Sequence, residues 1–244
     1  MVHGYHDYGL YASKATVAGL TDMAELAARL GSIVTYDRKG DVILLDDYEA
    51  TTAHFRDSSI PLATAALDTT VALSGAQCVK FTTPAVSDRY AEISYVIPPC
   101  YISKHGIKVS ISTYELSSLE GYYQIFALFY DGTNSHTLSI RITPKEYKVE
   151  LYTPTGYVTC ISNLFIDTSL PTWWHNVKLV YDLDTGYYTR LLIDALSYDL
   201  STYKYVKTAD TTTTLFEVYF TLYPTNDNAL VCYQEDFVYT INEP

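Results

Sequence analysis

The sequence predicts an all-β protein built as a β-sandwich, and three observations support this fold class. Short runs rich in Val, Ile, Thr, Tyr and Phe recur along most of the chain, separated by turn-forming residues. An acidic stretch at 46–49 opens this strand-rich region, and another at 234–239 closes it. Pairing of the first and last strands would leave fewer open sheet edges, which promote aggregation. The chain has no repeat of fixed period, which disfavours a solenoid or propeller.

Length and charge narrow the functional classes. The 244 residues fit one large β domain, or one domain with an appendage. Sixteen basic against 28 acidic residues give a net charge of −12, which argues against binding to nucleic acid or to anionic membranes. No apolar run reaches the roughly 18 residues of a membrane span. Residues 1–8 lack the basic and apolar regions of a signal peptide, so we expect synthesis in a cytosol and release by lysis or another route.

The first 45 residues predict an N-terminal arm, a helix and a hairpin. Asp22 and Glu25 have capping-box spacing, and Gly31 supplies a C-terminal stop. The helix expected over 22–30 has one apolar stripe, made of Met23, Leu26, Ala27 and Leu30. Three turns are marginal alone, so the stripe should dock on a partner surface as an assembly element. Residues 33–36 and 41–45 flank a turn at 37–40 and predict the hairpin.

Residues 46–244 predict the sandwich domain. Residues 107–112 alternate between apolar and polar, which predicts a strand with one face in water. Residues 123–129 are nearly all apolar, which predicts a central strand covered on both faces. The predicted strands are 77–82, 89–97, 107–113, 122–130, 137–143, 147–152, 157–161, 174–181, 187–193, 213–222 and 229–240.

Tyrosine and cysteine give weaker signals. The 25 tyrosines fit two explanations, the β-propensity of tyrosine and a surface committed to partners or sugars. The four cysteines, Cys78, Cys100, Cys160 and Cys232, are far apart and form no C-x-x-C pair. We expect them to be small buried apolar residues rather than zinc ligands.

Four local patterns occur in a fixed order along the chain. They are D-D-Y-E at 46–49, L-S-G-A-Q-C-V-K-F at 73–81, W-H-N-V-K-L-V-Y at 174–181 followed by L-L-I-D at 191–194, and E-D-F-V at 235–238. Together they resemble the jelly-roll β-sandwich shared by concanavalin-type lectins, laminin-G-like domains and carbohydrate-binding modules, over roughly residues 46–244. One departure is that His54-Phe55 stands where such modules usually have a tryptophan.

This resemblance implies a candidate metal site. In carbohydrate-binding jelly rolls, a glutamate of the opening strand and an aspartate of the closing strand often hold a structural calcium. Glu49 and Asp236 match these positions, with Asp47 nearby. Calcium takes six to eight oxygens, so backbone carbonyls near Ser74 would contribute. The alternative is that these acids are solvated or pair with Lys80.

The N-terminal segment carries a second resemblance. E-L-A-A-R-L-G-S at 25–32, D-R-K-G-D-V at 37–42 and the D-D-Y-E strand look like the start of tailed-phage virion proteins, which carry a jelly roll behind a short anchoring segment. Such proteins decorate capsids or form tail appendages. The resemblance explains the lack of a signal peptide, because virions assemble inside the cell and leave by lysis.

The sequence predicts no catalytic residues. A sandwich glycosidase needs two carboxylates a fixed distance apart, and on one strand they would stand at i and i+2 or i+4. Glu217 is alone in its strand, while Asp182 and Asp184 fall in a turn whose hydrogen bonding accounts for them. Neither a G-x-S-x-G elbow nor a Gly-rich phosphate loop occurs.

Two further groups of residues are candidates for ligand binding. Gly4 disfavours a helix through His3, His6 and Asp7, so a contact of the arm is preferred to a metal site there. Trp174 is expected in the core, and the ligand-binding residues stay unassigned. The aromatic residues near predicted turns that could stack on sugars are Trp173, Tyr187, Tyr188, Tyr203, Tyr205 and Tyr223.

The leading hypothesis is a non-enzymatic virion structural protein, either a capsid decoration or a tail appendage, assembled in the host cytoplasm. Residues 1–45 would fasten it to the particle, and the lectin-like jelly roll would project outward. The expected partners are further copies of the chain, other virion proteins and a glycan, without nucleic acid or membrane insertion. The alternative is a carbohydrate-binding module for host or glycan recognition, acting outside the cell. A sandwich glycosidase is the third hypothesis.

Overall fold

The computed structural model describes residues 40–50, 52–73, 75–86, 88–98, 103–113, 120–164, 166, 170–210 and 216–244. Within these ranges the chain is built of β-strands and one short 3-10 turn, η2 (Pro144–Glu146), and it has no helix able to cross a membrane. The predicted arm with His3, His6 and Asp7, the helix at 22–30 with its stripe, and the 33–36 half of the hairpin lie outside the described residues.

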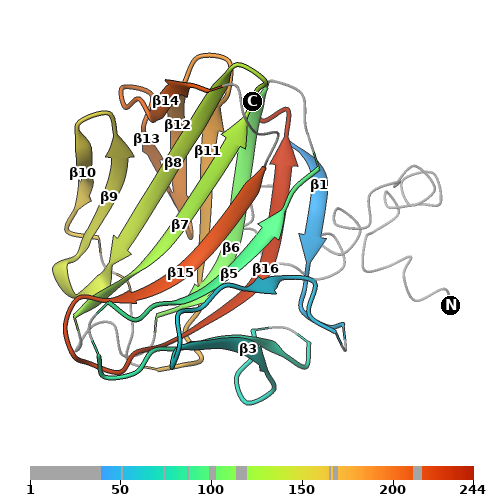
Figure 1. The fold of residues 1–244 in the computed structure, drawn as a ribbon, viewed down its shortest axis with the longest axis vertical. Helices are drawn as coiled ribbons and strands as arrows, with labels where there is room; N and C mark the ends of the chain where they lie inside the picture. Colours follow the sequence, from blue (N-terminus) through green and yellow to red (C-terminus); the bar gives the residue numbers. More distant parts are fainter. Residues whose placement is uncertain are drawn as a thin grey trace, which may run out of the picture. The chain divides into compact units, whose positions relative to one another are not determined.

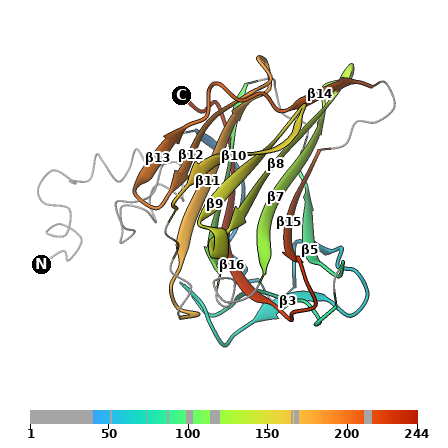
Figure 2. The ribbon, with the colours of Figure 1, turned by 90° about the vertical axis from the view of Figure 1, so that its left-hand side faces the viewer.

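Two antiparallel sheets stack face to face and form the predicted jelly-roll β-sandwich (Figures 1 and 2). Sheet A contains, in spatial order, β13 (Leu196–Asp199), β12 (Tyr187–Ile193), β11 (His175–Asp182), β6 (Lys104–Ser112), β16 (Val231–Ile241), β4 (Cys78–Thr82) and β3 (Thr64–Asp68), and β1 (Asp41–Asp46) also pairs with β16. Sheet B contains β10 (Gly156–Ser162), β9 (Lys148–Thr153), β8 (Asn134–Thr143), β7 (Gly121–Tyr130), β15 (Glu217–Pro224), β5 (Ala91–Val96) and β2 (Arg56–Asp57), and β14 (Val206–Ala209) also pairs with β8.

The core lies between the inner faces of the sheets. Because successive side chains of a strand point to opposite faces, every second residue of each central strand enters it. On β7 these are Tyr123, Ile125, Ala127 and Phe129, which are at most 2% exposed. The inner residues of the other central strands include Ile107, Val109 and Ile111 on β6, Val177 and Leu179 on β11, Leu138 and Ile140 on β8, and Val218 and Phe220 on β15.

The sequence identified the strands well. Each of the eleven strands predicted beyond residue 46 corresponds to an observed strand, and the short strands β2, β3, β13 and β14 were not predicted. Residues 41–45, assigned from the sequence to the N-terminal hairpin, pair with β16 as part of sheet A, so the described part of the sandwich begins before residue 46.

The opening motif is built into the sandwich beside the closing strand. Asp46 lies opposite Phe237 in the β1–β16 pair, so the first and last described strands are neighbours as predicted. Asp46 is 4% exposed, and its carboxylate accepts hydrogen bonds from the Tyr48 backbone N–H at 3.0 Å and from the Tyr95 hydroxyl at 2.9 Å. The Tyr48 hydroxyl in turn accepts a bond from Gln234. Asp46 and Tyr48 of this motif therefore have a structural role. Asp46, on sheet A, is joined to Tyr95, on sheet B.

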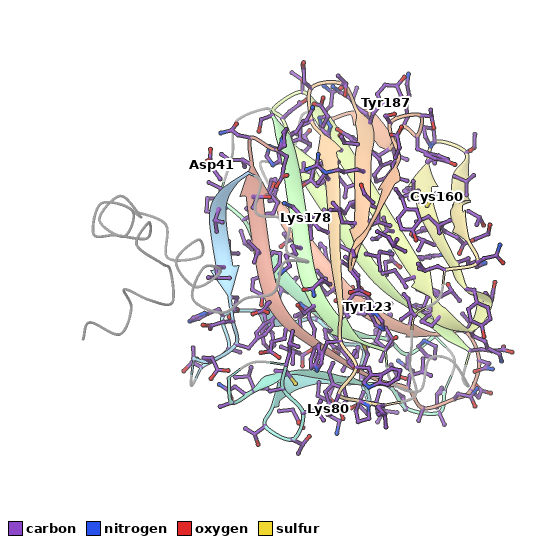
Figure 3. The ribbon with its side chains drawn as sticks, turned by 180° about the vertical axis from the view of Figure 1, so that it is seen from behind. Asp41, Lys80, Tyr123, Cys160, Lys178 and Tyr187 are labelled. Atoms are coloured by element: carbon purple, nitrogen blue, oxygen red, sulfur yellow. The ribbon has the colours of Figure 1, made fainter. Side chains whose placement is uncertain are left out.

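The predicted exposure of two central strands was wrong in opposite directions. On β6, expected to have one face in water, the outward side chains Lys108, Ser110 and Ser112 are also buried, and Lys178 beside them is 4% exposed (Figure 3). On β7, expected to be covered on both faces, the outward residues are only half-buried. The outward rings of Tyr122 and Phe126 on β7 contact Tyr223 and Tyr219 on β15, and this outer face of sheet B remains partly accessible.

The structure also shows the environments of the cysteines, of the turn at Asp182 and of Trp174. Cys78 and Cys232 are fully buried and Cys160 is half-buried, while Cys100 is outside the described residues. The turn interpretation of Asp182 and Asp184 is confirmed, because the Asp182 carboxylate accepts the backbone N–H of Asp184 at 2.9 Å. Trp174 precedes β11 and is half-buried, so the expectation that it fills the core was wrong.

Candidate functional site

The three acids of the predicted calcium site have separate partners. One oxygen of Glu49 accepts the backbone N–H groups of Ala76 at 2.8 Å and Gln77 at 3.2 Å, so this carboxylate caps the turn before β4. Asp47 accepts the N–H of Glu49 at 3.1 Å. Asp236 lies in a bulge of β16 with a φ of 55°. Burial raises the pKa of Asp236, Lys108 opposes this shift and Asp47 adds to it.

These contacts do not form the oxygen cage that calcium requires. One oxygen of Glu49 is occupied by N–H donors, and Asp236 has the Lys108 amino group as well as the Asp47 carboxylate as charged neighbours. Among the described residues, no three His, Cys, Asp or Glu side chains are grouped to hold a metal ion. No ion pair joins Lys80 to these acids in that part of the chain. Ser74 lies outside the described residues, so the calcium assignment stays a prediction.

The outer face of sheet B carries a row of stacked aromatic rings. Tyr223 on β15 lies directly opposite Tyr122 on β7, and their rings are 5.2 Å apart and within 5° of parallel. The ring of Tyr90 stacks on the other face of Tyr223 at 5.8 Å. Rings that stack face to face across strands about 4.8 Å apart must stand upright on the sheet. They therefore present edges and hydroxyl groups to the solvent, not open ring faces.

Arg141 continues this row on β8. Its guanidinium carbon lies 4.4 Å from the ring centre of Tyr122 and 3.5 Å from that of Tyr157 on β10, so it is sandwiched between two rings. The ring of Tyr157 in turn contacts Tyr152 on β9 at 5.0 Å. We call the row Tyr90, Tyr223, Tyr122, Arg141, Tyr157 and Tyr152 the aromatic ladder. It runs obliquely across the sheet, from the residue before β5 to β10, because Arg141 lies opposite Gln124 and Glu150, and the Tyr152–Tyr157 pair lies two residues further along β9.

A polar network fixes the middle of the aromatic ladder. Gln124 lies opposite Arg141 in the β7–β8 pair, and its carbonyl oxygen accepts a bond from Arg141 Nε at 3.4 Å. The Gln124 amide donates to the Tyr157 hydroxyl at 3.2 Å, and that hydroxyl donates to Ser139 at 3.1 Å. Burial raises the pKa of Tyr122 to about 12, while Arg141 opposes the shift. Tyr122 thus stays a neutral hydrogen-bonding group at ordinary pH.

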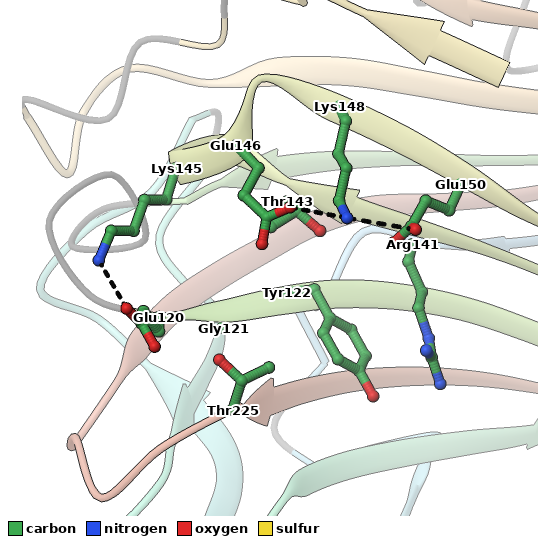
Figure 4. Close-up of a pocket in the computed structure, with 10 residues that line it drawn as sticks. All are labelled: Glu120, Gly121, Tyr122, Arg141, Thr143, Lys145, Glu146, Lys148, Glu150 and Thr225. Carbon is green, nitrogen blue, oxygen red and sulfur yellow. Dashed lines mark hydrogen bonds and ion pairs between the residues drawn. The ribbon is translucent and has the colours of Figure 1, made fainter. Parts of the chain in front are cut away.

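A hollow of about 290 Å³ lies beside the aromatic ladder, where β7, β8 and β9 begin or end (Figure 4). Tyr122 and Arg141 form one wall. Lys145 pairs with Glu120 at 3.1 Å, and Lys148 bridges Glu146 at 2.7 Å and Glu150 at 3.2 Å. The other residues lining the hollow are Gly121, Thr143 and Thr225. The hollow therefore offers hydroxyls, charged groups and one ring edge to a polar ligand.

The same face also carries two carboxylates on adjacent strands, Glu92 opposite Thr221 and Glu217 four positions further along, opposite Val96. Glu92 on β5 accepts a bond from Thr221 at 2.8 Å, and Glu217 on β15 accepts one from the Tyr219 hydroxyl. Burial raises the pKa of Glu92, the Thr221 bond opposes this, and the Glu217 charge adds to it. The sequence search considered pairs on a single strand and missed this one. Its members come from adjacent strands, whose register cannot be found from sequence spacing.

The aromatic residues considered from the sequence divide into several environments. Tyr223 belongs to the aromatic ladder, whereas Tyr188 and Tyr205 are buried in the core. Trp173 is 43% exposed and contributes nothing to this face. Tyr122, Tyr157 and Arg141 were not singled out. All three side chains point outward from β7, β8 and β10. They could have been identified only with knowledge of which face of sheet B is exposed.

No protein-family model and no curated protein match the sequence. Solved structures share the fold at low identity. An endo-β-1,4-glucuronan lyase from the fungus Trichoderma reesei matches with a TM-score of 0.55 and 12% identity, over 83% of this chain and 96% of that one. A carbohydrate esterase of the Shiga toxin-encoding bacteriophage phi24B matches at 0.53 and 11%, over 84% and 100%. The cellulose-induced protein Cip1 matches at 0.53 and 14%, over 81% and 96%. These matches establish the jelly-roll fold.

Proposed function

We propose that the sandwich is a non-catalytic carbohydrate-binding domain whose ligand lies along the aromatic ladder and in the adjoining hollow. The aromatic ladder carries this proposal. A binding surface needs polar groups held in fixed positions beside apolar area, and stacked rings are rigid supports for hydroxyl groups. The bonds among Gln124, Tyr157 and Ser139 fix the geometry further. A sugar chain presents the complementary mixture of hydroxyl groups and C–H surface.

Recognition in this domain would rely on ring edges and hydroxyls. A flat sugar-stacking platform needs two or three exposed coplanar rings, whereas the rings of Tyr90, Tyr223 and Tyr122 are stacked on one another. The proposal therefore does not depend on a flat stacking surface. It depends on the hydrogen-bond donors and acceptors that the aromatic ladder places in a row across the strands of sheet B.

A glycan array followed by calorimetry tests the proposal. We expect the protein to bind at least one class of glycan and Tyr122→Leu to weaken that binding by about tenfold, because it removes a central ring of the aromatic ladder and part of the hollow. Tyr187→Leu, on β12 of sheet A, is the matched control and should bind normally. Absence of glycan binding, or equal binding by Tyr122→Leu, would refute the proposal.

Glycan cleavage is the second candidate function, and the Glu92–Glu217 pair is the observation that favours it. Two carboxylates whose environments differ can divide the acid and base roles of glycoside hydrolysis. Binding alone remains the preferred function, since both carboxylates accept bonds from neighbouring hydroxyls and the three glutamates of the hollow pair with lysines. Release of new reducing ends that is abolished by Glu217→Gln would establish hydrolysis instead.

The virion role concerns where this domain acts, and it stays a prediction. The resemblance of residues 25–49 to phage virion proteins motivates it, and the proposed glycan binding fits a host-recognition device. Replacing Leu26 and Leu30 by Asp should weaken oligomer or particle attachment while the thermal stability of the sandwich changes little. An unchanged oligomer with a strongly lowered melting temperature would mean that the stripe packs on its own chain.

A further inference from the structure

Arg141 differs from the other basic residues that line the hollow. Lys145 and Lys148 both form ion pairs with glutamates within 3.2 Å. Arg141 has no carboxylate within ion-pairing distance among the described residues, although Glu150 lies directly opposite it in the β8–β9 pair. Glu150 pairs with Lys148 instead. With 28 acidic against 16 basic residues in the chain, an arginine without an acidic partner is not explained by a shortage of acids.

The guanidinium of Arg141 is held in one orientation. Its central carbon lies 4.4 Å from the ring centre of Tyr122 and 3.5 Å from that of Tyr157, and Nε donates to Gln124 at 3.4 Å. No hydrogen bond within the described residues uses its two terminal Nη groups. Figure 4 shows the Arg141 and Tyr122 side chains extending side by side from neighbouring strands. Two donors of a planar fork therefore remain available at the wall of the hollow.

A fixed guanidinium fork is best matched by a planar anion. A carboxylate can accept two parallel N–H···O bonds from it, a geometry that an ammonium group does not provide. The surrounding charges also limit the anion. Glu120, Glu146 and Glu150 line the same hollow, so a densely charged sulfated or phosphorylated polymer would meet repulsion there. One carboxylate with neutral hydroxyls around it fits this pattern.

We infer that the glycan bound at this face contains a uronic acid, whose carboxylate is held by the Nη groups of Arg141. This inference rests on the proposed glycan-binding function and names its substrate class. Tyr122 and the backbone of Gly121, at the start of β7, would then contact the hydroxyl groups of the same sugar. Lys145 and Lys148 line the same hollow but are paired with glutamates, which leaves Arg141 as the group that distinguishes an acidic from a neutral sugar.

The test compares each acidic oligosaccharide with its own neutral form. Tetrasaccharides of glucuronic, galacturonic and mannuronic acid, and the same molecules after reduction of the carboxyl groups, are titrated by calorimetry at fixed salt. We expect at least one acid form to bind more than about tenfold tighter than its reduced form. Arg141→Lys, which keeps the charge but loses the fork, and Arg141→Gln should both abolish this difference. Lys204→Gln, which removes a basic group lying over the Tyr187 ring outside the hollow, should keep it.

The outcomes separate this inference from the proposed function. Equal binding of acid and reduced forms, with Tyr122→Leu still weakening both, would overturn the uronate assignment and leave glycan binding in place. Absence of binding by every glycan would overturn both. Tighter binding of a heparin tetrasaccharide that is insensitive to Arg141→Gln would also overturn the assignment. The comparison of ligands on the unaltered protein decides the question even if the Arg141 variants fold poorly.

Discussion

The outer faces of the two sheets use basic side chains in contrasting ways. On sheet A, Lys178 is 4% exposed and its Nζ lies 2.7 Å from Glu243, whose other carboxylate oxygen is 3.0 Å from Arg190. On sheet B, Arg141 is stacked between tyrosine rings and has no acidic partner among the described residues. Equivalent outward positions thus stabilise the fold in sheet A and remain available to a ligand in sheet B.

Glu243 shows how completely the sheet A face is committed to structure. Its carboxylate also accepts a bond from Thr240 at 2.6 Å, and its backbone N–H donates to Lys104 at 3.1 Å. A Cβ atom at Gly106 would lie 2.8 Å from Glu243 Oε1, so this glycine provides the space for the carboxylate. Because a buried ion pair needs every lone pair satisfied, such a site leaves no capacity for a ligand.

The largest effect is expected from breaking this buried network. Glu243→Gln should lower the free energy of unfolding by about 3–5 kcal/mol, because it leaves the buried Lys178 and the half-buried Arg190 without their shared counter-charge. Urea denaturation measures the change. Glu120→Gln is the control, since its pair with Lys145 is about half exposed and should contribute less than about 1 kcal/mol. Similar losses in both variants would contradict the contrast between the two faces.

The fold was largely predictable because period-2 alternation and turn residues are local signals. Strands such as β8 and β12 appear in the sequence within a few residues of their observed bounds. Pairing is not local, so the membership of Asp41–Asp46 in sheet A could not be found. The exposure of β6 and β7 was predicted wrongly for a related reason. Alternation shows that two faces differ, but cover from distant segments decides which face is wet.

The candidate site was less predictable than the fold. Tyr223 was noted for its position near a turn, while Arg141 gave no signal because an arginine on a strand is usually a solvated residue. Its role follows from the rings of Tyr122 and Tyr157, which flank it in space and are 35 residues apart in sequence. The Glu92–Glu217 pair was missed because its members come from different strands.

The second-largest effect is a pH dependence of the free energy of unfolding, caused by the buried Lys108 on sheet A. Burial lowers the pKa of Lys108 from 10.5 to about 7, with Lys178 adding to the shift and Asp236 opposing it. Between these values the unfolded chain binds a proton that the folded chain has released, so stability should rise with pH from about 7 towards 10. The slope should approach but not exceed about 1.4 kcal/mol per pH unit.

Lys108→Met tests this dependence, because methionine keeps the apolar part of the side chain. Unfolding curves at pH 7, 8 and 9 should give a flatter profile for Lys108→Met than for the unaltered protein. Lys145→Met, at an exposed position, should keep the original slope. Parallel profiles for Lys108→Met and the unaltered protein would show that Lys108 is charged in the fold.

The third effect separates ring from hydroxyl in the aromatic ladder. Tyr223→Leu removes stacking on both Tyr90 and Tyr122, so it should lower stability by about 1 kcal/mol and weaken glycan binding several-fold. Tyr223→Phe keeps the ring and loses only an exposed bond to Asp88 at 3.2 Å, so its stability should change by no more than a few tenths of a kcal/mol. Equal losses in the two variants would mean that stacking is not what positions the aromatic ladder.

The smallest effect is expected at Glu92, the partly exposed acid of sheet B. Its pKa is raised from 4.5, so the folded chain holds a proton more tightly and stability should fall as pH rises through that shifted pKa. Glu92→Gln removes this cost and can still accept the Thr221 bond. Stability at pH 7 should therefore rise, by only a few tenths of a kcal/mol because water screens the site. Unfolding at pH 5 and 7 measures it, with Glu146→Gln as the control. A loss above about 1 kcal/mol at pH 7 would show that the Glu92 charge stabilises the fold, as the acids of sheet A do.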